Sequence, residues 1–99
     1  MNNGRVVYNT KAINWVLRNS KSKHSARLVL ISIACYTHKR SRVAWPSLHT
    51  LAKHCLLSSR QVIHAVKKLR GLGELRVEKR PAARRRGDST NLYEIRGKW

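Results

Sequence analysis

Residues 47–70 constrain the fold most, because they predict two short helices with almost no chain between them. The first helix follows Ser47, a favoured N-cap residue, and runs through LHTLAKHC. The second follows Ser58, and Gln61 three residues later completes a capping box ahead of VIHAVKKL. Only Leu56 and Leu57 separate the two patterns, so the link between the helices must be tight.

Each of the two helices has one apolar face, and two further helices precede them. The first of these is expected over about residues 10–19. The second runs through SARLVLISIACYTH and ends near His38. That last pattern is apolar almost all round, which is typical of a central, buried helix. The apolar faces comprise Ala12, Ile13, Val16 and Leu17; Leu48, Leu51, Ala52 and Cys55; and Val62, Ala65, Val66 and Leu69.

A β-hairpin is expected after the last helix, which Gly71 and Gly73 are suited to stop. The segments ELRVEK and NLYEIR both alternate, with Leu75 and Val77 on one side of the first strand, and Tyr93 and Ile95 expected to face inward from the second. RVAW, before the helix pair, reads as a short extended piece. The loop between the two alternating strands carries Arg80, Arg84, Arg85 and Arg86.

The charge of the chain points to a polyanionic partner. Lys and Arg number 22 against four acids, a formal net charge of +18, and the first 73 residues contain no acid. Solubility alone needs a net charge of only about 2–8 in a small domain. We therefore expect nucleic acid as the partner, with an anionic membrane surface as the lesser alternative.

Helix, tight turn, capped helix and hairpin together predict a mainly α fold with a small β-hairpin, the winged helix-turn-helix. We expect a single DNA-binding domain over residues 1–99, with its core at about 10–96. The second helix of the pair would enter the major groove, and the hairpin, or wing, would reach backbone or minor groove. The expected DNA contacts are Ser47, Ser58, Ser59, Arg60, Gln61, His64, Lys67, Lys68, Arg80, Arg84, Arg85 and Arg86.

The stretch VAWPSLHTLAKHCLLSSRQVIHAVKKLRGLGELRVEKR, followed by RRGDSTNLYEI, resembles the winged helix-turn-helix domain of phage and plasmid replication proteins. It is more distantly similar to bacterial regulators, at Leu51, Ala52, Ser58, Val62, Ala65, Leu69 and Gly73. The resemblance implies DNA binding more strongly than initiation of replication, and it leaves transcription regulation open. Leu56 stands where the family often has Gly, and a left-handed Leu would cost around 1 kcal/mol. Gln61 stands where Thr is frequent.

Other kinds of site have little support in the sequence. The five histidines and two cysteines form no C-x₂-C or H-x₃-H pair, so we expect no metal and no cofactor. We expect no catalysis either, since all four carboxylates lie in or beside the hairpin strands. Cys35 and Cys55 read as small buried hydrophobes, and most aromatic residues, including Trp15, Tyr36 and Tyr93, as core.

Without a long apolar run or a signal-peptide pattern, we expect an intracellular protein, and the resemblance implies the bacterial cytoplasm or nucleoid. Two other partners remain open on the sequence: a structured RNA, and an acidic host protein on which this basic module docks. The target site, a link to replication or transcription machinery and the oligomeric state are also open.

Overall fold

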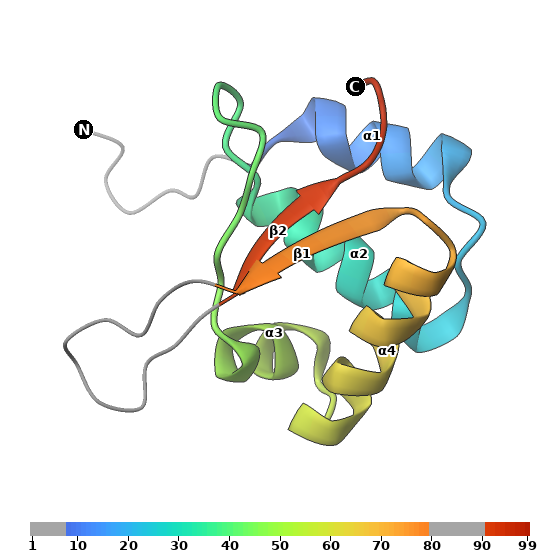
Figure 1. Cartoon of the computed structure of the whole chain (residues 1–99), viewed down its shortest axis with the longest axis vertical. Coiled ribbons are helices and arrows are strands. Elements are labelled where there is room, and N and C mark those ends of the chain that lie inside the picture. Colours follow the sequence, from blue (N-terminus) through green and yellow to red (C-terminus); the bar gives the residue numbers. More distant parts are fainter. Residues whose placement is uncertain (1–7, 80–90) are drawn as a thin grey trace, which may run out of the picture.

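The computed structural model describes residues 8–79 and 91–99, and in this part of the chain four helices precede a two-stranded antiparallel hairpin (Figure 1). The expected mainly α fold with a winged helix-turn-helix arrangement is confirmed. The elements are α1 (Thr10–Asn19), α2 (His24–Tyr36), α3 (Leu48–Cys55), α4 (Ser59–Gly71), β1 (Leu75–Lys79) and β2 (Asn91–Ile95).

Helix α2 is the centre of the packing, and it contacts α1, α3, α4 and β2. Val29, Leu30 and Ile33 are completely buried. The expectation that this helix is buried almost all round is wrong for Leu28, whose exposed fraction is 48% among the described residues. The helix also ends at Tyr36, two residues before the predicted His38.

The turn between α3 and α4 forms as the sequence predicts. The Ser47 Oγ accepts from the Thr50 N–H, and Ser58 and Gln61 make the reciprocal bonds of a capping box. Leu56 adopts the left-handed conformation, with φ 57° and ψ 45°, and its side chain is 90% exposed. The Leu57 N–H then bonds to the Ala52 carbonyl at 2.9 Å. The chain thus reverses within two residues, at a conformational cost borne by Leu56.

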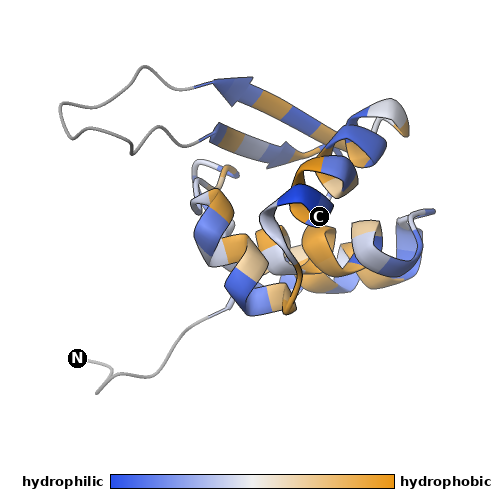
Figure 2. Cartoon of the chain, turned by 90° about the horizontal axis from the view of Figure 1, so that it is seen from below, coloured by the Kyte–Doolittle hydropathy of each residue, from blue (hydrophilic) through white to orange (hydrophobic). Residues whose placement is uncertain are grey.

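The hairpin pairs Leu75 with Ile95 and Val77 with Tyr93. The predicted alternation is confirmed, since Leu75, Tyr93 and Ile95 are buried, and Figure 2 shows the matching alternation of hydropathy along β1. The extended piece before α3 joins the same sheet through a bridge between Ala44 and Tyr93. The predicted loop arginines, Arg80, Arg84, Arg85 and Arg86, lie outside the described residues.

The structure differs from the sequence prediction at several residues of the core and at the end of α4. Gly71 is the last residue of α4 rather than its stop, and Gly73, with φ 77°, makes the turn into β1. Leu17 and Tyr36, which the sequence predicted as part of the core, are surface residues, 49% and 38% exposed. The two cysteines are partly rather than fully buried.

Replacing Leu56 by Gly should raise the free energy of unfolding by up to about 1 kcal/mol, because glycine adopts the left-handed conformation without steric cost. In a domain of this size that shift raises Tm by roughly 4–8 °C per kcal/mol. Thermal unfolding followed by circular dichroism measures it. Gly73→Ala is the opposite control, since it places a Cβ at φ 77° and should lower Tm. A lower Tm for Leu56→Gly would show that this Leu is not strained.

Candidate nucleic-acid interface

Helix α4 presents one continuous exposed polar face, because Val62, Ala65, Val66 and Leu69 turn inward on the opposite side. All five polar residues expected to contact DNA from this helix are exposed. At 100° per residue, Arg60, His64 and Lys67 lie at the middle of this face, and Gln61 and Lys68 lie at one edge of it. Lys67 also borders the groove toward the hairpin, whereas Gln61, His64 and Lys68 border residues 21–26.

The side of α4 that faces the hairpin borders an open groove of about 360 Å³. Its lining is Leu48, Ile63, Val66, Lys67, Arg70, Val77, Lys79, Asn91 and Tyr93. Of the predicted contacts, the groove includes Lys67. The sequence analysis missed Ile63, Arg70 and Lys79. Strand alternation could have found Lys79, since it shares a side with Leu75 and Val77.

Ile63 is unusual on this surface because it is a large apolar side chain that is 44% exposed. It lies three residues after Arg60 and four before Lys67, so the three side chains share one side of α4. A helix face that contacts only solvent usually carries polar residues, so an isoleucine is unexpected here. Its neighbours are cations, and an apolar side chain between them can contact the methyl group of a thymine base.

The other edge of this face borders a depression of about 500 Å³ between α4 and residues 21–26. Gln61, His64 and Lys68 line it from α4, and Lys21 and Lys23 from the facing segment. Neither lysine was predicted as part of a site, since nothing local in the sequence shows that this segment lies beside α4. The described residues that line this depression and the groove include no acid.

The predicted serine contacts order the helix N-termini. Ser58 Oγ accepts from the Gln61 N–H at 3.1 Å, and Gln61 Oε1 accepts from the Ser58 N–H at 2.9 Å. Ser47 Oγ accepts from the Thr50 N–H at 3.0 Å. A bidentate contact with adenine uses both the oxygen and the nitrogen of the Gln61 side-chain amide. Such a contact would compete with this cap, because Oε1 already accepts from the Ser58 N–H. Ser59, the first residue of α4, is exposed beside it.

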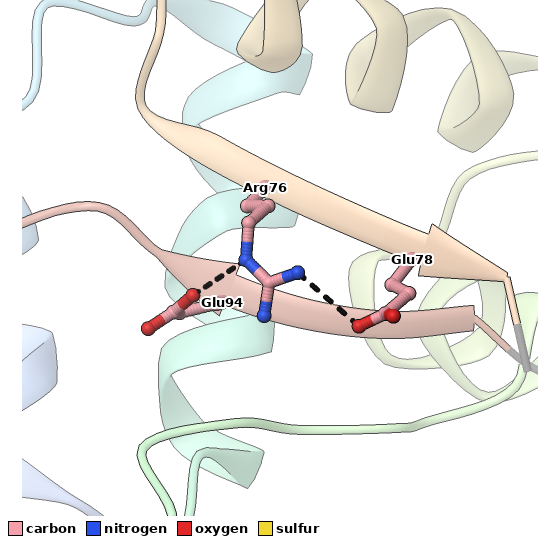
Figure 3. Close-up of polar contacts among 3 residues, drawn as sticks. All are labelled: Arg76, Glu78 and Glu94. Carbon is pink, nitrogen blue, oxygen red and sulfur yellow. Dashed lines mark hydrogen bonds and ion pairs between the residues drawn. The ribbon is translucent and has the colours of Figure 1, made fainter.

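The described carboxylates lie away from α4. Arg76 donates from Nε to Glu94 at 2.7 Å and from a guanidinium nitrogen to Glu78 at 3.2 Å, on the outer side of the hairpin (Figure 3). Hydrogen bonds to Glu94 and then to Glu78 raise the pKa of Arg76, so it stays charged. Together these three side chains carry a net charge of −1. A polyanion is therefore favoured on the α4 side of the hairpin over the outer side.

Glu74, the other described carboxylate, is 9% exposed and does not line the depressions that border α4. It accepts from the Ser20 Oγ at 2.6 Å and from the Lys21 N–H at 2.7 Å. These bonds tie the chain before α2 to the start of the hairpin, and they hold the Lys21 segment next to α4.

The cysteines and histidines offer little for chemistry. Burial raises the pKa of both Cys35 and Cys55, and so favours the neutral thiol. No three His, Cys, Asp or Glu residues gather as metal ligands within the described ranges 8–79 and 91–99. In those ranges, too, no helix has the length and apolar character to cross a membrane.

The comparisons with known proteins agree with this geometry. A family model described as a helix-turn-helix domain matches residues 23–73, about half of the chain. The match runs from the residue before α2 to the glycine after α4. No curated protein and no solved structure matches the chain. Domains of this kind bind duplex DNA through the second helix of the pair. The chain belongs to this helix-turn-helix domain family.

Proposed function

We propose that this chain binds duplex DNA with α4 in the major groove and the hairpin against the backbone or minor groove. The observation that carries the proposal is the acid-free, cation-lined surface on both sides of a capped second helix. The opposite charge on the outer side of the hairpin supports the same orientation, since Glu78 and Glu94 would then face away from the phosphates.

Arg60 and the residues on the hairpin side of α4 have the proposed base-reading role. Arg60 lies in the first turn, where helices of this type meet base edges, and arginine pairs with guanine through two hydrogen bonds. Lys67, Arg70 and Lys79 follow along the groove and suit phosphate contacts. Arg80, Arg84, Arg85 and Arg86 of the wing have the same proposed role on backbone or minor groove.

Biologically, we propose an accessory factor of DNA replication or of transcription regulation in a phage, plasmid or bacterium, acting in the cytoplasm where that DNA lies. It would act by binding rather than by catalysis. Selection from a random duplex pool tests the proposal, combined with salt titrations on duplex DNA, duplex RNA and single strands. An enriched DNA motif supports it. A preference for duplex RNA, or equal binding to every polyanion, contradicts it.

Arg60→Ala should lower the ratio of specific to random-sequence affinity. The loss of one guanine contact should reduce the free energy of discrimination by about 1–3 kcal/mol. Arg85→Ala should weaken binding to all sequences alike and flatten the dependence of log K on log salt by about one unit. Competition binding at several salt concentrations separates the two effects. An Arg60→Ala variant with unchanged sequence preference would remove Arg60 from the base-reading role.

Ile63→Ala should weaken specific binding through a lost contact with a thymine methyl group. Deoxyuridine, which lacks this methyl, replaces each thymidine of the selected site in turn. At the thymidine that Ile63 contacts, this base change should weaken binding by the wild type but leave binding by Ile63→Ala unchanged. Leu17→Ala, on α1 and of similar exposure, is the matched control and should respond as the wild type does. Additive effects at every position would exclude the methyl contact.

A further inference from the structure

A second cationic surface lies outside the α3–α4 region, and we call it the loop surface. It comprises Lys11 of α1 and Lys39, Arg40 and Arg42 of the loop between α2 and α3. These residues border two adjoining depressions of about 630 and 330 Å³ that share Asn9 and Lys39. Among the described residues that line them, none is acidic.

The loop surface has a fixed backbone. The His38 N–H bonds to the Val43 carbonyl, and the Arg42 N–H to the His38 carbonyl, both at 2.9 Å. The Arg42 guanidinium stacks over the Trp99 ring at 4.2 Å and donates to the Gly97 carbonyl at 3.0 Å. Arg42 thus anchors the loop to the C-terminal segment. Lys39 and Arg40 remain exposed at its tip.

The loop surface and α4 lie at opposite ends of the molecule. In Figure 1 the loop, α1 and the C-terminal segment lie at the top, and α3 and the start of α4 lie at the bottom. The longest dimension of the chain is 38 Å. The Debye length at physiological salt is about 8 Å, so polyanions bound at the two ends would repel each other only weakly.

We propose that the loop surface binds the backbone of a second DNA duplex, so that one protein bridges two duplexes; this rests on the proposed function of α4. Phosphate is favoured over a stacked base as the ligand, because the Arg42 guanidinium already covers one face of the Trp99 ring. A DNA bound along α4 leaves the loop-surface cations without a counter-charge. The phosphates of a second duplex would neutralise these cations, and the contact would release further counterions from that duplex.

The test is a bridging assay in which duplex on beads captures a second, fluorescent duplex through the full-length protein. Binding to one duplex is measured separately by anisotropy. Wild type should capture the second duplex. Lys39→Ala/Arg40→Ala should reduce capture at least fivefold, while affinity for a single selected duplex changes less than twofold. The matched control Arg18→Ala/Arg96→Ala removes the same charge from other exposed positions and should capture like wild type.

Each contrary outcome is decisive. Single-duplex binding without capture by the wild type would overturn bridging and leave the proposed function intact. Equal loss of capture in the two double variants would overturn it as well, because net charge alone would then explain capture. Full capture by Lys39→Ala/Arg40→Ala would remove the loop surface from any role. If the wild type bound no duplex at all, the proposed function and the bridging inference would both fail.

Discussion

The corner between α3 and α4 determines where the proposed DNA contacts of α4 lie. Leu56 takes a left-handed conformation there, and the capping box of Ser58 and Gln61 starts α4 immediately afterwards. The two bonds of that box satisfy backbone and side chain together, so the first turn of α4 is ordered before any DNA arrives. A looser corner would leave Arg60 free to move, and a bidentate base contact requires a fixed geometry.

Charge is distributed as unevenly in space as it is in sequence. Glu78 and Glu94 pair with Arg76 on the outer side of the hairpin, and Glu74 is buried against the chain before α2. The cations of α4, its flanking segment and the loop surface therefore have no described carboxylate in the depressions they border. This arrangement accounts for the proposed orientation of DNA and for the proposed second duplex.

Local patterns predicted the helices, their caps and the strand alternation, because these depend on residues a few positions apart. Contacts between distant segments were not predictable in this way. The depressions along α4 depend on Lys21 and the hairpin lying beside the helix, and the loop depends on Arg42 meeting Trp99, 57 residues away. For the same reason the sequence misjudged the burial of Leu17, Leu28 and Tyr36, whose exposure depends on how distant segments pack around them.

The most direct test of the account is nuclear magnetic resonance of the ¹⁵N-labelled chain titrated with its selected duplex, at a salt concentration that suppresses random binding. The account predicts that backbone amide shifts change most at the start of α3, along α4 and at the inner side of the hairpin. Shifts spread evenly over all basic residues, or concentrated around Arg76 on the outer side of the hairpin, would contradict it.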